Sequence, residues 1–97
     1  MTRAIRFTRT ADDDLDRIWL YAADYDVATA DRLIDRLRNA ASRLIDYPRS
    51  APVRFEKGPL RGLSAHRHIL FYVFDDATVT ITRVFDARQN WREYLLK

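Results

Sequence analysis

The sequence DLDRIWLYAADYDVATADRLIDRLRNAASRLIDYP, residues 14–48, carries two successive runs of apolar residues at helical spacing. Each run predicts a helix with one apolar stripe, the first ending near Tyr25 and the second ending at Pro48. Asp26 is the predicted N-cap of the second helix. The connection between the helices is so short that they must fold back as an antiparallel hairpin. The first stripe is Leu15, Ile18, Trp19 and Ala22, and the second is Ala30, Leu33, Ile34, Leu37, Ala41, Leu44 and Ile45.

The segment before the hairpin predicts a strand and a capped helix start. Apolar and polar side chains alternate over residues 3–9, which is typical of a half-buried strand. We expect the hydroxyl of Thr10 to cap the first helix by accepting from the backbone N–H of Asp13. The aspartates at 12–14 put negative charge where the helix dipole is positive, which explains them better than metal-assisted catalysis does.

The segment after the hairpin predicts a loop and then a β meander. Residues 48–60 hold all three prolines and form the loop, and strands are expected over 60–65, 67–74 and 79–85. Both faces of residues 69–74 are apolar, as in a central strand covered on two sides. Residues 89–96 predict a short closing helix. By parity Arg83 shares the buried face, so either a bulge turns it outward or it is a partly buried, paired arginine.

These elements predict an α+β fold of order β-α-α-β-β-β, with an antiparallel sheet, a helical hairpin on one face and a short C-terminal helix. At 97 residues the chain is expected to form one domain over residues 1–97. It has no cysteine, its longest apolar run is too short to cross a bilayer, and its N-terminus lacks the apolar stretch of a signal peptide. We therefore expect a cytoplasmic protein that does not contact a membrane.

The charge is distributed unevenly between the two halves. Residues 1–48 carry eight Arg and nine Asp, whereas residues 49–97 carry nine basic and five acidic side chains. Arginine outnumbers lysine by 15 to two. The second half is thus suited to a negatively charged partner, although such charge also serves solubility alone.

Few arrangements in the sequence support catalysis or metal binding. The two glycines exclude a glycine-rich phosphate loop, and the serines lack nucleophile-elbow spacing. His66 and His68 lie two apart in a strand-like segment and point the same way, but further metal ligands are missing nearby, so we expect no metal and no cofactor. What remains is a basic and aromatic set that could bind phosphates and bases, dock an acidic protein segment, or form a solvated face. It comprises Arg49, Arg54, Lys57, Arg61, Arg67, Arg83, Arg88 and Arg92, with Tyr72, Trp91 and Tyr94.

Several stretches, taken in order, resemble the RelE/ParE toxins. Residues 14–21, 30–37 and 47–48 are similar to the helical hairpin of that family, and residues 60–61, 69–73 and 81–88 are similar to its last three strands. The resemblance spans nearly the whole chain. The sequence departs from the usual ParE pattern at Asp86-Ala87, where His-Gly is common, and at Gln89, where an Asp is expected.

The resemblance implies the toxin of a type II toxin–antitoxin module, held by its cognate antitoxin in a hetero-oligomer. Ile18-Trp19 and the long second helix are more similar to the ParE branch, whose members inhibit DNA gyrase without catalysis. The alternative is the RelE branch, which cleaves messenger RNA on the ribosome, with Arg61, Arg88 and Tyr94 as its catalytic residues. The expected target-binding residues are Arg61, Arg67, Arg83, Arg88, Trp91 and Arg92. The expected antitoxin-binding residues are Trp19, Tyr21, Leu33 and Leu37.

Overall fold

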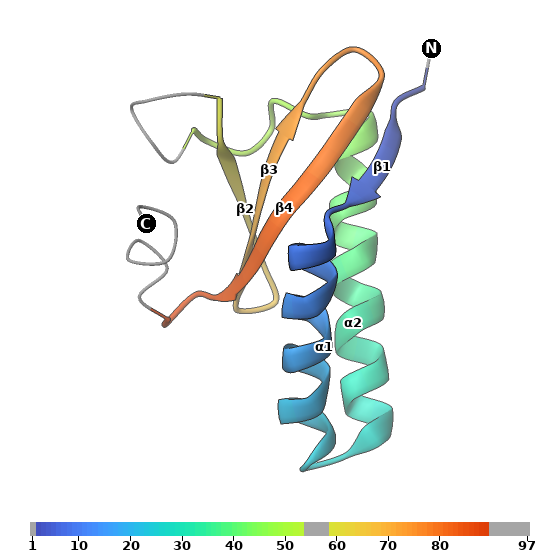
Figure 1. Ribbon diagram of the computed structural model, residues 1–97, viewed down its shortest axis with the longest axis vertical. Coiled ribbons are helices and arrows are strands. Elements are labelled where there is room, and N and C mark those ends of the chain that lie inside the picture. Colours follow the sequence, from blue (N-terminus) through green and yellow to red (C-terminus); the bar gives the residue numbers. More distant parts are fainter. Residues whose placement is uncertain (1, 54–58, 90–97) are drawn as a thin grey trace.

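The structure, a computed structural model, describes residues 2–53 and 59–89. Strand β1 (Ala4–Phe7) precedes helices α1 (Arg9–Ala23) and α2 (Val27–Ser42), and a 3-10 turn, η1 (Arg43–Ile45), follows them. Strands β2 (Arg61–Ala65), β3 (His68–Phe74) and β4 (Thr78–Asp86) complete the order. Figure 1 shows the two helices side by side against the sheet. The predicted order β-α-α-β-β-β is confirmed, whereas the closing helix predicted over 89–96 lies outside the described residues except for Gln89.

The four strands form one mixed sheet in the order β1-β4-β3-β2. The pairs β2–β3 and β3–β4 are antiparallel, but β1 runs parallel to β4, with Phe7 opposite Ile81. The prediction of a wholly antiparallel sheet was therefore wrong for β1. Alternation within a strand sets its faces but not its direction, and here the whole helical hairpin lies between β1 and its partner.

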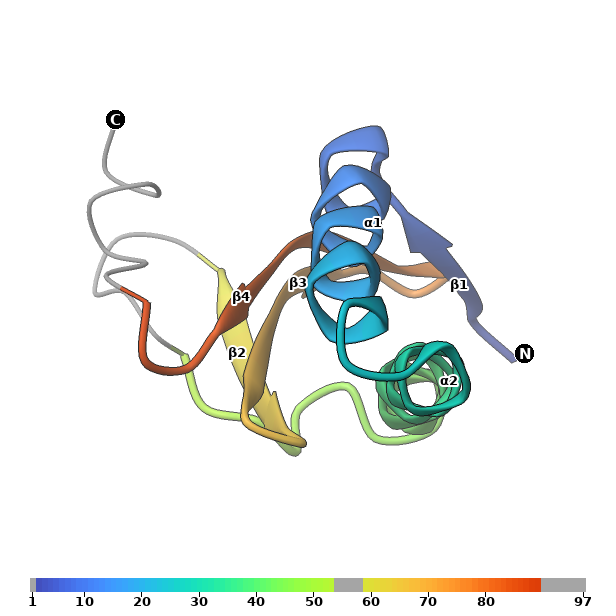
Figure 2. The ribbon, with the colours of Figure 1, turned by 90° about the horizontal axis from the view of Figure 1, so that it is seen from below.

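The main core lies between the helices and one face of the sheet. Figure 2 shows the two helices from the end of the hairpin, with the twisted sheet beside them. Leu37 and Leu44 from the helical segment pack there with Tyr72 and Ile81 from the sheet. A smaller cluster of Ile69, Phe71 and Phe85 belongs to the opposite face. Strand β3 therefore buries apolar side chains on both faces, as its sequence predicts.

Hydrogen-bonded caps set the starts of both helices. The α1 cap is Thr8, not the predicted Thr10: the Thr8 hydroxyl accepts from the N–H of Ala11 at 3.1 Å and donates to the carbonyl of Thr82 at 3.0 Å. This tie to β4 favours the earlier residue. Asp26 caps α2 as predicted, accepting from the N–H of Thr29 at 3.0 Å. No helix within residues 2–53 and 59–89 has the length and apolarity needed to span a membrane.

The helical segment ends earlier than the proline predicts. Helix α2 stops at Ser42, and the tighter turn η1 carries Leu44 into the core before the loop begins. Apolar spacing alone does not separate an α-helix from a short 3-10 continuation. In the loop the carbonyl of Pro48 accepts from the Tyr72 hydroxyl at 2.6 Å, and burial raises the pKa of Tyr72. The loop is thus fastened to the sheet by a buried hydrogen bond.

A bulge in β4 explains the parity conflict at Arg83. Phe71 lies opposite Arg83 while Tyr72 lies opposite Ile81, so Thr82 is an extra residue without a direct partner. Its hydroxyl donates to the carbonyl of Phe71 at 3.2 Å. Both alternatives raised for Arg83 are realised: the bulge changes its direction, and it is partly buried and paired.

The partner of Arg83 is Asp14, a carboxylate of α1 whose side chain is 1% exposed. Asp14 accepts from Arg83 Nε at 2.8 Å and from the backbone N–H of Val84 at 2.9 Å, and it also pairs with Arg17. Strand β1 has already ended at Phe7, so this part of β4 has no neighbouring strand on that side. The carboxylate takes the hydrogen-bonding place that a further strand residue would occupy, and so fixes α1 to the sheet.

We predict that Asp14→Ala lowers the free energy of unfolding by about 3–5 kcal/mol, because it strands a partly buried guanidinium and a buried N–H. Urea denaturation followed by circular dichroism measures the loss. Asp16→Ala, an exposed position on the same helix, is the matched control and should change stability by less than about 0.5 kcal/mol. Equal effects of the two variants would contradict the role given to Asp14.

Candidate functional site

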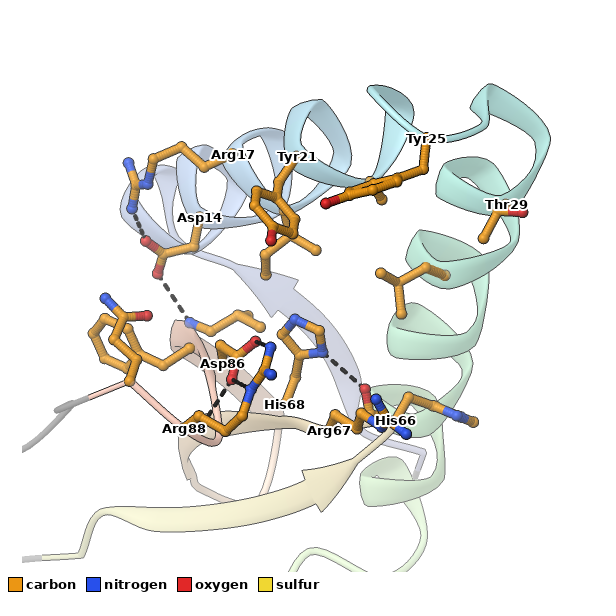
Figure 3. A pocket seen from close by; sticks show the side chains of 16 residues that line it. Asp14, Arg17, Tyr21, Tyr25, Thr29, His66, Arg67, His68, Asp86 and Arg88 are labelled. Carbon is orange, nitrogen blue, oxygen red and sulfur yellow. Dashed lines mark hydrogen bonds and ion pairs between the residues drawn. The ribbon is translucent and has the colours of Figure 1, made fainter.

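A groove of about 700 Å³ opens between the helical hairpin and one end of the sheet. Its walls come from the second half of α1, the first turns of α2, the β2–β3 turn and the end of β4. Figure 3 shows Tyr21 and Tyr25 on one side of it, across from Asp86, Arg88 and the β2–β3 turn. We call this cavity the hairpin groove. It brings together segments that are far apart in the sequence.

Three arginines from three different segments line the hairpin groove: Arg17 of α1, Arg67 of the β2–β3 turn and Arg88 beyond β4. The buried wall between them contains Asp14, which already pairs with Arg17 and Arg83. Guanidinium groups bind carboxylates and phosphates in a planar, two-point geometry. The groove is therefore suited to an anionic or acidic ligand.

The position of Arg67 depends on an unfavourable turn. Ala65 pairs with His68, which leaves His66 and Arg67 as a two-residue loop. Both have positive φ, 49° and 67°, in the left-handed region that tight hairpin turns require and that glycine or asparagine fills more readily. Each such residue costs about 1–2 kcal/mol. The prediction that Arg67 begins the strand was wrong, because the turn includes Arg67 as well as His66 and the strand begins at His68.

The same turn separates the two histidines. His66 is exposed in the loop, whereas His68 is the first residue of β3 and is buried, with Nδ1 2.9 Å from the carbonyl oxygen of His66. They do not share a strand face as the sequence spacing suggests. Among the described residues no three histidine, aspartate or glutamate side chains are grouped for a metal ion.

Arg88 is held by an acidic neighbour. Asp86 accepts from the backbone N–H of Arg88 at 2.8 Å, and its two oxygens each accept from the guanidinium at 3.2 Å. This hydrogen bonding holds the pKa of Asp86 below its ordinary value and raises that of Arg88. The Arg88 side chain is 80% exposed, so the pair is weak and another anion can replace Asp86. Arg88 is thus oriented without being buried.

Aromatic and apolar side chains extend the groove toward the turn between the helices. The rings of Tyr21 and Tyr25 meet edge to face with centroids 6.0 Å apart, and the two residues are 68% and 80% exposed. A hydrogen bond with Tyr21 raises the pKa of Tyr25 above its ordinary value. Leu20 and Val27 are also exposed at this end of the hairpin. A cluster of exposed large apolar residues marks a surface for contact with another macromolecule.

The structure gathers only part of the predicted target-binding set. Arg67 and Arg88 line the hairpin groove, and Arg83 lies behind its wall in the pair with Asp14. Arg61 lies at the opposite end of β2 from the turn and bonds the carbonyl of Ala51 at 2.7 Å. Trp91 and Arg92 of this set lie outside the described part of the chain, as does Tyr94 of the predicted catalytic set.

The predicted antitoxin-binding residues also divide. Tyr21 and Leu33 line the hairpin groove. The Trp19 indole donates to Asp31 at 2.8 Å, which fastens α1 to α2. Leu37 is completely buried in the main core, so including it among contact residues was wrong. Its place in the helical repeat marks a core position as readily as a docking position.

Arg17 and Tyr25 line the groove but were not among the predicted site residues. With Asp14 and Tyr21 they lie three and four residues apart, so they form a second stripe beside the apolar one on α1. That spacing is a usable signal. It does not reveal which sheet residues the stripe will face.

Comparison with known proteins gives a family and a set of similar folds. A family profile described as "ParE toxin of type II toxin-antitoxin system, parDE" matches residues 5–91. A search of curated proteins by sequence gave no match. The chromosomal ParDE toxin–antitoxin system of P. aeruginosa contains a similar chain, with a TM-score of 0.77 at 17% identity over 88% of this chain and 96% of the other.

Two further solved structures share the fold. The toxin–antitoxin complex RelBE2 from Mycobacterium tuberculosis gives a TM-score of 0.68 at 25% identity, over 89% of this chain and 99% of the other. The E. coli DinJ–YafQ toxin–antitoxin complex gives 0.59 at 15% identity, over 89% and 93%. At 17% and 15% identity the likeness is one of fold alone.

We predict that Arg88→Gln raises the pKa of the Asp86 carboxyl toward its ordinary value, because the two guanidinium hydrogen bonds that favour its charged form are lost. A carboxyl ¹³C NMR titration measures this. Since the folded-state pKa is lowered, the pair is intact above the ordinary carboxyl pKa and breaks as pH falls through the lowered value. Arg17→Gln should leave the Asp86 midpoint in place, and a midpoint unaffected by Arg88→Gln would contradict the pairing.

Proposed function

Because the chain belongs to the ParE family of toxins from type II toxin–antitoxin systems, we propose that it inhibits DNA gyrase and that the hairpin groove forms the contact. As a toxin of this kind it has a cognate antitoxin as its partner. The observation that carries the proposal is the convergence of Arg17, Arg67 and Arg88 with Tyr21 and Tyr25 in one groove. Binding, without catalysis, is sufficient for this function.

The chemistry of the groove favours a protein target with acidic and apolar residues. Arginine and tyrosine are the residues that most often dominate protein interfaces, because each combines a large contact area with hydrogen bonding. Arg67 and Arg88 would meet acidic groups, while Tyr21 and Tyr25 would cover apolar ones. Asp86 pairs with Arg88 in the way that a carboxylate of the target would, and the target would have to replace it.

We also propose that the antitoxin neutralises the toxin by covering the hairpin groove. Leu33 lines its floor and Tyr21 its rim, which suits the apolar face of an amphipathic segment. The outer edge of β2 offers an additional surface for strand addition, apart from the place where Pro52 accepts from the N–H of Gly62 at 3.1 Å. Antitoxin and target would then compete for the same residues.

A second candidate is a ribosome-dependent endoribonuclease. The observation that favours it is the presence of His66 beside Arg67 and Arg88 in the same groove, since a base and cations are what cleavage at a 2′-hydroxyl requires. Of the catalytic residues expected from the sequence, Arg88 lines the groove, Arg61 lies at the other end of β2 from it, and Tyr94 lies outside the described residues. This separation makes the endoribonuclease the weaker candidate.

For gyrase, we predict that the purified toxin in stoichiometric excess stops DNA supercoiling. The double variant Arg67→Ala/Arg88→Ala should need a roughly tenfold or greater concentration for half inhibition, since it removes two charged contacts. Arg36→Ala, an exposed arginine of α2 outside the groove, is the control with the same side-chain change. Undiminished supercoiling with the wild-type toxin would reject the proposal, and codon-positioned cuts in a primer-extension assay would establish the endoribonuclease instead.

For the antitoxin, we predict that Tyr21→Ala weakens binding by roughly tenfold or more, as expected for an aromatic contact near the centre of an interface. Isothermal titration calorimetry with the purified antitoxin measures the change. Tyr47→Ala is the matched control, because Tyr47 is 70% exposed and lies in the loop after η1, outside the groove. If both variants bound like the wild type, the antitoxin would have to occupy a different surface.

A further inference from the structure

A second group of arginines surrounds one aromatic ring, away from the hairpin groove. The guanidinium carbons of Arg3, Arg49 and Arg61 lie 5.6, 5.2 and 5.8 Å from the centroid of the Phe74 ring. We call these four residues the Phe74 cluster. Arg61 begins β2 and Phe74 ends β3, so the cluster is at the end of this hairpin opposite the His66–Arg67 turn. It is therefore a separate feature of the surface.

Backbone carbonyls hold two of these guanidiniums in place. Arg61 donates to the carbonyls of Ala51 and Arg49 at 2.7 and 3.4 Å. Arg3 donates to the carbonyls of Asp75 and Ile45 at 2.8 and 3.4 Å. These acceptors are neutral, so they orient the cations without cancelling their charge. The ring face adds an attraction for cations that also leaves the net charge unchanged.

The cluster has more positive than negative charge. None of the ion pairs among residues 2–53 and 59–89 involves Arg3, Arg49 or Arg61. The carboxylate of Asp75 is bound within its own turn, because its Oδ1 accepts from the backbone N–H groups of Ala77 and Thr78 at 2.8 Å. These hydrogen bonds lower the pKa of Asp75, and the charge of Arg3 lowers it further. Because all three guanidiniums share one ring, no two of their carbons are more than about 11 Å apart. Like charges gathered this closely favour binding of an anion.

We propose that the Phe74 cluster binds the phosphate backbone of nucleic acid. Guanidiniums fixed along one edge present their remaining N–H groups to oxyanions, and a polynucleotide brings regularly spaced phosphates to them. A peptide is a poorer fit, since the edge of β2 beside Arg61 is already covered: Val53 bridges to Arg61, and Gly62 donates to Pro52. The ring is enclosed by the three cations, so it gives an apolar side chain little to contact. Recognition there depends on charge and is independent of base sequence.

This site would place the toxin on DNA by a surface other than the hairpin groove. It does not depend on the proposed inhibition of gyrase, because the two sets of residues are separate. The two proposals can therefore fail separately. When Arg49→Ala is added to the groove variant Arg67→Ala/Arg88→Ala, DNA binding should weaken by the same factor as when it is added to the wild type.

The test uses the purified full chain and fluorescein-labelled DNA duplexes of two unrelated sequences, with binding followed by anisotropy between 50 and 200 mM salt. Arg49→Ala is the informative variant, because the Arg49 side chain makes no hydrogen bond to another described residue; its backbone carbonyl is the group that accepts from Arg61. A thermal melt checks that the variant folds. We expect it to weaken both duplexes about equally, by roughly fivefold, and to reduce the log–log salt slope by about one. Arg36→Ala, with the same loss of charge on α2, should bind like the wild type.

Three results would overturn the proposal. One is equal weakening by Arg49→Ala and Arg36→Ala, which would mean attraction to net charge alone. Another is an unchanged salt slope in Arg49→Ala. The third is binding of poly-glutamate that competes with DNA at equal charge concentration and is equally sensitive to Arg49, which would identify a site for acidic protein segments. Competition by inorganic phosphate only at tens of millimolar would support a site that needs a polymer of phosphates.

Discussion

The position of the helical hairpin depends on the carboxylate of Asp14. Strand β1 covers only the first half of β4, and the chain then turns away into α1, which leaves the rest of that strand edge without a partner. Asp14 fills the place by accepting from the Val84 N–H and from Arg83, with its own side chain only 1% exposed. This pair fixes which turn of α1 lies against which residue of β4. In this register Arg17 and Tyr21 of α1 line the same groove as Asp86 of β4.

The sequence predicted the elements of the fold better than their directions and ends. Two helical stripes and an apolar central strand are strong periodic signals, and both were confirmed. The cap at Thr8 was missed because it depends on a hydrogen bond to Thr82, a contact made only in the folded chain. The parallel pairing of β1 was missed for a related reason, because strand alternation is the same in either direction. Arg83 was the informative exception. Its position breaks the alternation of the strand, and this conflict predicted a bulge or a partly buried ion pair, both of which the structure contains.

The candidate site was less predictable because it is assembled from four distant segments. Arginine content indicated an anionic partner, but it did not separate cations that line the groove from cations that support the backbone. Arg67 and Arg88 belong to the first kind. Arg61 belongs partly to the second, since it fastens the loop after η1 through Ala51. Similarly, a helical repeat lists Leu33 and Leu37 as equivalent, and only the sheet decides that one lines a groove while the other is fully buried.

The left-handed turn at His66 and Arg67 carries an evolutionary consequence. An asparagine–glycine pair there would relieve about 1–2 kcal/mol of strain at each position, so selection for a sturdier fold alone would be expected to replace both residues. The same replacement would erase a cation and an imidazole from the rim of the groove. A substitution that relieved the strain would therefore exchange two polar side chains of the groove wall for backbone stability. The turn is thus a place where natural variation among relatives should report on what the toxin binds.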